Sequence, residues 1–155
     1  MLVRTFASAV AGIDAVTVTI EVNVSQGVRF FLVGLPDVAV KESQQRIESA
    51  LKNNGFHWPG KKVVVNMAPA DIRKEGSAYD LPIALGILAA SEQLTSEHFD
   101  KFVMMGELSL DGSLQRIHGV LPIALQAKNE GFRGMGVKKD NLYDFAGLLA
   151  RLEGR

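Results

Sequence analysis

One stretch constrains the fold more than any other: LPIALGILAAS, residues 81–91, is apolar on almost every side when it is drawn as a helix. Such a helix is a buried one, because a helix at the surface of a globular protein keeps a polar face. Pro82 is tolerated only in the first helical turn, so we expect the helix to begin between Ser77 and Asp80. We therefore expect residues 81–90 to lie in the core of a single domain that spans residues 1–155.

The strand pattern is clearest in VTVTIEVNVS, residues 16–25, which alternates strictly between apolar and polar side chains. This period of two predicts a half-buried strand. The segment SQG then predicts a turn and VRFFLVG a second strand, so we expect a hairpin. Further strands are predicted in residues 2–10, 62–68, 102–110 and 132–137.

Helices are predicted between these strands. One follows Asp37, a suitable N-cap, and ends before Gly55, which fits the left-handed position after a helix. Others are predicted in GVLPIALQAKNEG, ended by Gly131, and in NLYDFAGLLARL. Strands that alternate with helices in this order predict an α/β (α+β) fold with helices packed on a mixed sheet.

Composition excludes several classes of function. Lys and Arg number 17, as do Asp and Glu, so the chain is neutral overall and gives no simple argument for nucleic-acid binding. Cysteine is absent, which excludes disulfides and thiolate chemistry. The N-terminus lacks a continuous signal-peptide core and no apolar run reaches 18 residues, so we expect a cytoplasmic protein without a membrane partner. The apolar pattern that runs to the C-terminus predicts that the chain is a piece of a longer protein.

The sequence contains neither a nucleotide-binding motif nor metal-ligand spacing. The Gly-Lys pair in WPGKKV has neither the earlier glycine nor the hydroxyl residue of a phosphate-binding loop, so we expect no cofactor in this chain. The three histidines, His57, His98 and His118, lack metal-ligand spacing, which predicts solvated or capping roles and no metal site.

Ser77 could act as a nucleophile, as part of an anion cradle, or as a cap or turn residue. A nucleophile would need a neighbouring base, and Lys74 is near in sequence. The segment EGSAY is not the GxSxG elbow of hydrolases, so local chemistry favours the cap or turn.

Three segments predicted to be loops carry pairs of basic residues. If they converge on one edge they can follow a phosphate backbone, with an aromatic residue available to stack on a base. The other interpretation is ordinary solvated charge. The candidate nucleic-acid contacts are Trp58, Lys61, Lys62, Arg73, Lys74, Lys138 and Lys139.

Three segments together carry a family resemblance: GLPDVAVKESQQRIESALKNNGF, VVVNMAPADIRKEGSAYDLPIALGILAAS and MMGELSLDGSLQRIHGVLPIA. In order and spacing they resemble the N-terminal part of magnesium-chelatase-like AAA+ ATPases of the competence (ComM/YifB) type. The resemblance implies the fold of ribosomal protein S5 domain 2, shared with the Lon protease domain and with RadA, in which one βαβ crossover is left-handed.

The resemblance also implies that the Lon-type dyad is missing. The position of the nucleophile falls on Ala78 and that of the lysine on Leu121, neither of which can do the chemistry. Ser77 is then a cap, as its local sequence also favours.

For the whole protein, the resemblance implies an AAA+ ATPase that binds ATP and magnesium outside this chain. It also implies a homo-hexamer that works as a DNA branch-migration helicase in recombination during competence. This chain would be a non-catalytic domain that packs on the ATPase ring and contacts DNA. The alternatives are a structural oligomerisation domain, a subunit of a magnesium-chelatase-type ATPase and, remotely, a Ser–Lys peptidase that uses Ser77 and Lys74.

Overall fold

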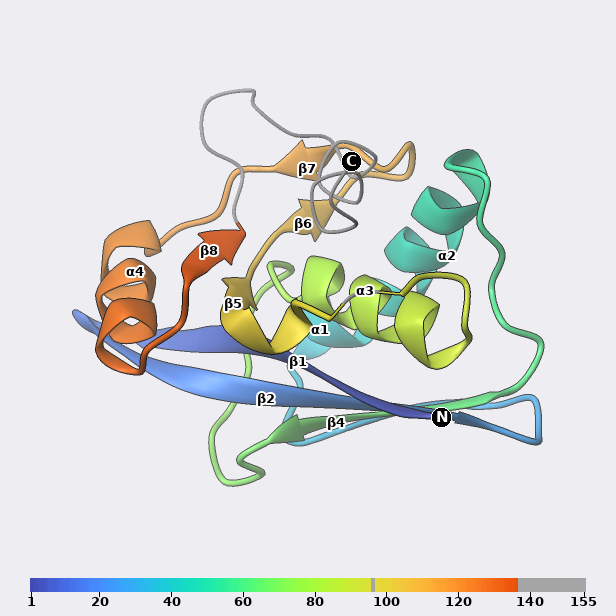
Figure 1. Ribbon diagram of the computed structural model, residues 1–155, viewed down its shortest axis with the longest axis horizontal. Coiled ribbons are helices and arrows are strands. Elements are labelled where there is room, and N and C mark those ends of the chain that lie inside the picture. Colours follow the sequence, from blue (N-terminus) through green and yellow to red (C-terminus); the bar gives the residue numbers. More distant parts are fainter. Residues whose placement is uncertain (96, 137–155) are drawn as a thin grey trace.

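The computed structural model describes residues 1–95 and 97–136 (Figure 1). Its helices lie on a long, twisted sheet. The strands are β1 (Leu2–Ala11), β2 (Asp14–Ser25), β3 (Phe30–Val33), β4 (Lys62–Ala68), β5 (Phe102–Met104), β6 (Glu107–Leu108), β7 (Leu114–Gln115) and β8 (Gly134–Gly136). The helices are α1 (Val38–Lys41), α2 (Ser43–Asn53), α3 (Asp80–Ala90), the 3-10 helix η1 (Phe99–Lys101) and α4 (Val120–Asn129).

The main sheet has the strand order β3-β4-β2-β1-β5-β8, and β6 and β7 form a separate small hairpin. β1 pairs with β2 in antiparallel fashion along its full length, from Leu2 opposite Asn23 to Ala11 opposite Asp14. The pairs β3–β4, β1–β5 and β5–β8 are parallel, whereas β2–β4 is antiparallel. This mixed sheet with packed helices confirms the predicted α/β fold.

Helix α3 is the centre of the core, as its composition predicts. All its residues from Asp80 to Ala90 are buried, and it packs on both β1 and β2. The approach to β2 is close: a Cβ placed on Gly86 would lie 2.6 Å from a methyl carbon of Val22. The hydroxyl of Thr5 on β1 donates to the carbonyl of Pro82 at 2.9 Å, which ties the same helix to the neighbouring strand.

The predicted alternation in β2 is confirmed over most of its length. Val18, Ile20, Val22 and Val24 are all buried, whereas Val16 is 40% exposed near the tip of the β1–β2 hairpin. The predicted hairpin between β2 and β3 is wrong. β4 lies between these two strands and pairs with both, because a parallel partner for β3 has to return through α1 and α2.

Three element boundaries differ from prediction. Asp37 does cap a helix, accepting from the amide of Val40 at 2.8 Å, but the helix breaks at Glu42 into α1 and α2. The predicted strand 102–110 divides into β5 and β6, because the segment between them turns away to bond with the start of α3. The predicted strand 132–137 is β8, and the predicted helix in NLYDFAGLLARL lies outside the described residues.

Candidate functional site

Two segments that are far apart in sequence join at the start of α3. The amide of Lys74 donates to the carbonyl of Leu35 at 3.0 Å, and the amide of Asp37 donates to the carbonyl of Lys74 at 2.9 Å. The carboxylate of Asp37 caps α1 with one oxygen and accepts the Gly76 amide at 3.0 Å with the other. GLPD and RKEG therefore form one hydrogen-bonded unit, which we call the α3 entry.

Lys74 is fully buried within this unit. Its ammonium donates to the carbonyl oxygens of Gly34, at 2.8 Å, and of Pro69. Burial lowers the pKa of Lys74, against a smaller opposing effect of Asp71. The prediction that Lys74 contacts nucleic acid is wrong, because its charge is satisfied by backbone carbonyls inside the protein. In both bonds the ammonium acts as a donor, whereas a base for Ser77 would have to accept a proton.

Asp80, the first residue of α3, makes a buried ion pair. Arg46 of α2 donates to its two oxygens at 2.6 and 3.0 Å and to the carbonyl of Ala39 at 2.6 Å, while the Leu108 amide adds a bond to Asp80 at 3.1 Å. The side chain of Asp80 is 1% exposed. One carboxylate thus joins α2, α3 and β6.

Burial and hydrogen bonding act in opposite directions on the pKa of Asp80. Burial raises the pKa of Asp80 to about 6, although its hydrogen bonds from Arg46 and Leu108 act to lower it. The pKa of Arg46 is raised, chiefly by its hydrogen bond to Asp80. We expect both groups to be charged at neutral pH, since the carboxylate has three donors and a permanent cation beside it.

Ser77 lies in a turn ahead of α3 and its carbonyl accepts the amide of Asp80 at 3.2 Å. The turn role is confirmed, but the side chain is not the helix cap, since the N-cap residue is Tyr79 and it makes no side-chain cap bond. Ser77 and Ala78 line a pocket of about 440 Å³ together with His118 and Ile123. Leu121, the other dyad position, is 69% exposed and is not part of this wall.

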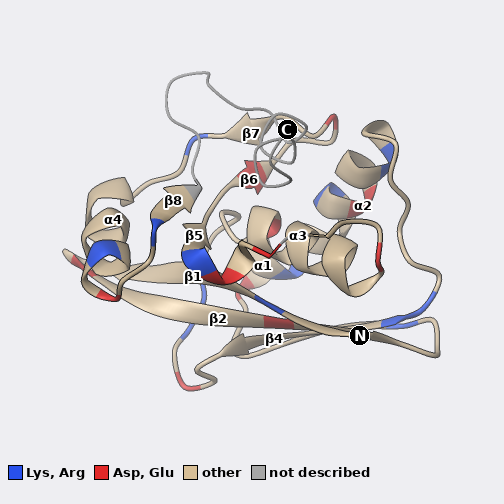
Figure 2. Ribbon diagram, viewed as in Figure 1, with Lys and Arg blue, Asp and Glu red and all other residues tan. Residues whose placement is uncertain are grey.

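The described basic candidates do not converge. Lys61 and Lys62 stand at the start of β4, and Arg73 follows its end, so about 20 Å of strand separates them. Figure 2 shows blue segments at the end of the sheet near the N-terminus, whereas the loop after β4 carries red beside blue. Arg73 is exposed and pairs with Glu75 at 3.2 Å. Lys138 and Lys139 lie outside the described residues.

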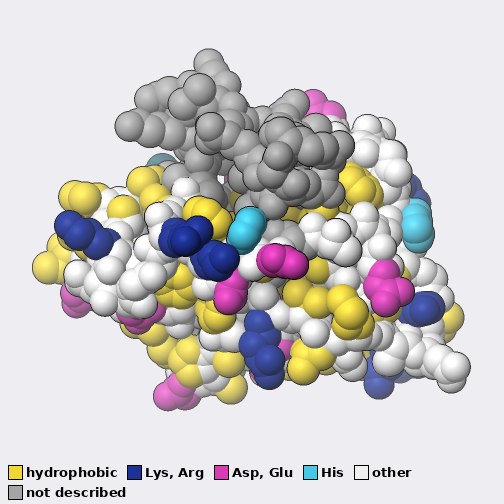
Figure 3. Space-filling model, in the orientation of Figure 1, with side chains coloured by type: hydrophobic (Ala, Val, Ile, Leu, Met, Phe, Trp, Pro, Cys, Tyr) yellow, Lys and Arg dark blue, Asp and Glu magenta, His cyan; other side chains and the backbone are white. Residues whose placement is uncertain are grey.

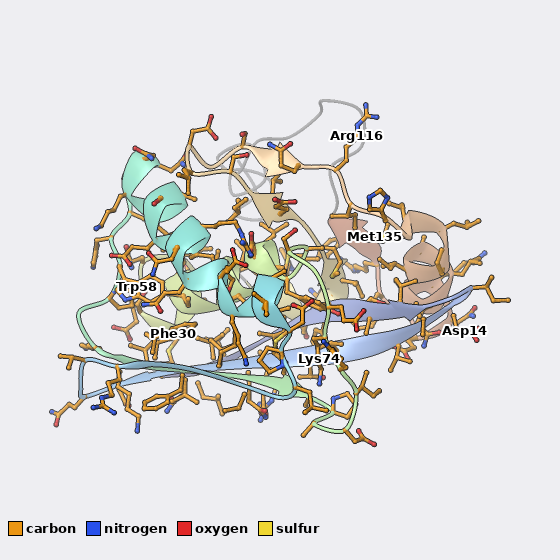
Figure 4. All side chains as sticks on the ribbon, turned by 180° about the vertical axis from the view of Figure 1, so that it is seen from behind. Asp14, Phe30, Trp58, Lys74, Arg116 and Met135 are labelled. Atoms are coloured by element: carbon orange, nitrogen blue, oxygen red, sulfur yellow. The ribbon has the colours of Figure 1, made fainter. Side chains whose placement is uncertain are left out.

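Trp58 is partly buried and packs against the edge of the core. Its ring centroid lies 5.6 Å from that of Phe30, and Figure 4 shows the two residues next to each other, well apart from Lys74. This packing opposes the predicted stacking on a nucleic-acid base. On the outer face of the sheet, the Lys62 ammonium sits 5.5 Å from the centre of the Phe31 ring.

Arg29 is a neighbour of Lys62 that was not predicted from the sequence. Its carbonyl accepts the Val63 amide at 2.8 Å, which brings Arg29, Lys61 and Lys62 to one end of the sheet; we call these three residues the basic sheet end. Within the described residues none of them pairs with an acidic side chain. Only the β3–β4 pairing brings Arg29 there, so no local sequence signal could have identified it.

The histidines are dispersed. The backbone amide of His57 bonds to Gln93, the ring of His98 lies 3.1 Å from the Lys101 ammonium, and His118 lines the pocket at Ala78. Residues 1–95 and 97–136 contain no cluster of three His, Asp or Glu side chains suited to a metal ion. In the same ranges, no helix has the length and apolar character needed to cross a membrane.

Comparison with known proteins gives consistent matches. Residues 20–141 match the family model described as subunit ChlI of Mg-chelatase. The chain is 48% identical over 137 residues to competence protein ComM of Haemophilus influenzae, covering 88% of this chain and 27% of ComM. It is 45% identical over 142 residues to the uncharacterized protein YifB of Escherichia coli, covering 91% of this chain and 28% of YifB. An uncharacterized protein of Mycobacterium bovis is 39% identical over 140 residues, which is 90% of this chain and 28% of that protein. The chain thus spans little more than a quarter of the length of these relatives.

Proposed function

The chain belongs to the family of the ChlI subunit of Mg-chelatase, and from that premise we propose that it is a non-catalytic, DNA-contacting domain of a longer AAA+ ATPase. ATP and magnesium would bind to the part of the longer protein outside this chain. That protein would act as a hexamer in DNA branch migration. Only the link to competence is suggested by the name of the relative, competence protein ComM. Its cytoplasmic location is part of the same proposal.

The basic sheet end carries the DNA-contacting part of this proposal. Arg29 and Lys61 are exposed, and Lys62 is held over the Phe31 ring. The chain has equal numbers of basic and acidic residues, and Figure 3 shows both signs interspersed on the face in view. Three cations that have no acidic partner among residues 1–95 and 97–136 are therefore a local exception that suits contact with a phosphate backbone. Such contact would be independent of base sequence, because phosphate groups carry no sequence information.

The test is fluorescence anisotropy of the chain with labelled single-stranded DNA and a labelled four-way junction across a salt series. We expect affinity to fall steeply with salt. Replacing Arg29, Lys61 and Lys62 together with alanine should make the plot of log affinity against log salt shallower by about 2 to 3. The matched control removes the same charge elsewhere through Lys41→Ala, Arg73→Ala and Lys128→Ala. No binding at low salt, or equal losses in both triple variants, would contradict the proposal.

A second candidate function is structural, and the α3 entry favours it. Lys74, Asp37 and Asp80 use their polar atoms in hydrogen bonds to the protein itself. A domain built in this way would serve assembly of the longer protein. Sedimentation velocity without DNA tests this alternative: a discrete oligomer that persists in high salt supports it, and a monomer at all concentrations opposes it for this chain.

A further inference from the structure

A pocket of about 360 Å³ lies directly beside the basic sheet end. Its walls come from the start of β1 with the end of β2, from the loop before β4, and from the end of α3, which Figure 1 places at the same end of the molecule. Lys61 belongs both to this pocket and to the basic sheet end. The volume lies within the range of about 300–1,000 Å³ that is usual for ligand sites. A molecule that contacts the basic sheet end therefore has a cavity of ligand size within reach.

Hydrogen bonds hold the walls of this pocket in place. The side-chain carbonyl of Gln93 accepts the His57 amide at 3.0 Å, and its amide group donates to the His57 carbonyl and to the Ser91 hydroxyl, both at 2.9 Å. These bonds tie the loop before β4 to the end of α3. At the remaining wall, the ammonium of Met1 donates to the carbonyl of Val24 at 2.7 Å. The pocket is therefore pre-formed, which reduces the entropy lost when a ligand binds.

The lining of the pocket combines donors, acceptors and a ring. Lys61 supplies a cationic donor, Glu92 supplies a carboxylate, and the exposed side chain of His57 supplies a flat aromatic surface. Opposite charges on one lining do not suit a lone ion. They suit an uncharged, flat group that has donors and acceptors along its edge, and a nucleobase is such a group.

The backbone at Glu92 supports a role for its side chain. Glu92 follows the last turn of α3, where its amide donates to the carbonyl of Ala89 at 3.1 Å, and its φ is 63°. Glycine is the usual residue at such a position, because a Cβ disfavours the left-handed backbone. The glutamate therefore keeps a carboxylate at the pocket where a glycine would relax the backbone.

We propose that the pocket takes one unpaired base of a DNA strand whose phosphates contact the basic sheet end, with the Glu92 carboxylate accepting from an exocyclic amino group of that base. This inference rests on the proposed contact with DNA and names the form of DNA that the site prefers. Lys61 links the two parts, because a phosphate and its base are adjacent groups of one nucleotide. The ring of His57 is available to stack on the base. Paired DNA would first have to turn a base out of its stack, so we expect single strands to bind more tightly.

The test is fluorescence anisotropy with three labelled strands of equal length: oligo-dC, oligo-dT and an abasic backbone with the same number of phosphates. All three should show the same dependence on salt, since that dependence follows the phosphates. We expect the abasic strand to bind the wild type about tenfold more weakly than oligo-dC does. Oligo-dT should fall between them, because thymine has a carbonyl oxygen where cytosine has its amino group.

Two variants test the assignment of the pocket. Glu92→Gly removes the carboxylate and places a residue suited to the backbone there, so we expect a folded protein that no longer prefers oligo-dC over oligo-dT. His57→Ala removes the exposed ring and should reduce the difference between oligo-dT and the abasic strand. The matched controls, Glu97→Gly and His98→Ala, alter exposed residues outside the pocket and should leave both preferences unchanged.

NMR of the isotope-labelled wild type locates the base. Amide shifts that differ between bound oligo-dC and the bound abasic strand should lie in residues 57–61 and 90–92, which line the pocket or lie between residues that do. Three results would overturn the proposal: equal affinity for oligo-dC and the abasic strand, an unchanged preference for oligo-dC in folded Glu92→Gly, and differential shifts away from the pocket. In each of these cases the contact of phosphates with the basic sheet end still stands. If no strand binds at low salt, the proposed function fails and this inference fails with it.

Discussion

Two basic pairs that look alike in the sequence, Lys61–Lys62 and Arg73–Lys74, have opposite surroundings at the two ends of β4. At the start of the strand, Lys61 and Lys62 face outward and have no acidic partner in the part of the chain that the structure describes. Beyond its end, Lys74 is enclosed and bonded to carbonyls, and Arg73 pairs with Glu75. The difference teaches that one basic pair contributes to the architecture of the α3 entry, while the charge available to a partner lies at the opposite end of the same strand.

The largest expected effect is at the buried ion pair. Arg46→Ala should lower the free energy of unfolding by about 3–5 kcal/mol, because the Asp80 carboxylate would stay buried with only the Leu108 amide as a donor. Urea unfolding measures this loss. The matched variant is Lys52→Ala, which breaks an exposed pair with Glu48 and should change stability by about 0.5 kcal/mol or less. Similar losses in the two variants would remove the contrast between interior and surface.

The pH dependence of the free energy of unfolding is a second test of the contrast between the buried and the exposed ion pair. The pKa of Asp80 is raised from 3.8 to about 6, so the folded state binds a proton that the unfolded state lacks between these values. The contribution of Asp80 is therefore fully present below pH 3.8 and is lost as the pH rises through about 6. Compared with Asp80→Asn, the wild type should lose up to about 3 kcal/mol between pH 4 and 7. Parallel stability curves for the two proteins would show that the carboxyl titrates normally.

Lys74 and Lys61 provide the direct comparison of the two ends. Lys74→Met should cost about 1–3 kcal/mol, because it leaves the Gly34 and Pro69 carbonyls without their donor, and should leave DNA affinity unchanged. Lys61→Met should do the reverse, with little change in stability and weaker DNA binding. Thermal unfolding and anisotropy on both variants test this, and weakened DNA binding by a stable Lys74→Met protein would contradict the assignment.

The smallest effect is expected from two glycines. Gly86→Ala should destabilise by about 1 kcal/mol, since the clash with Val22 outweighs the better helix propensity of alanine. In a Val22→Ala background the same change should become stabilising. Gly60→Ala has open space around the new methyl group and should be neutral or slightly stabilising. Thermal unfolding of the four variants measures these differences, and an unchanged sign for Gly86→Ala in the Val22→Ala background would argue against close packing there.

Local pattern predicted much of this fold but little of the candidate site. The apolar character of α3 and the alternation in β2 are properties of residues close together in the sequence, so the local sequence pattern predicts both elements. The insertion of β4 between β2 and β3 depends on pairing across about 40 residues and leaves no trace in the turn that follows β2. Lys74 and Lys61 are the same residue type in similar contexts, and only the carbonyls around Lys74 distinguish them.

The place of β4 also has a consequence for how the chain acquires its structure. β2 and β3 are separated by a short turn, yet neither can complete its pairing until residues 62–68 arrive between them. The entropy of closing that loop must be lost before the contacts of the sheet offset it, which slows folding. We expect the β1–β2 hairpin to form early and the edge strand β3 to join late. During synthesis the apolar strand β3 would therefore stay unpaired until about 30 further residues have been made.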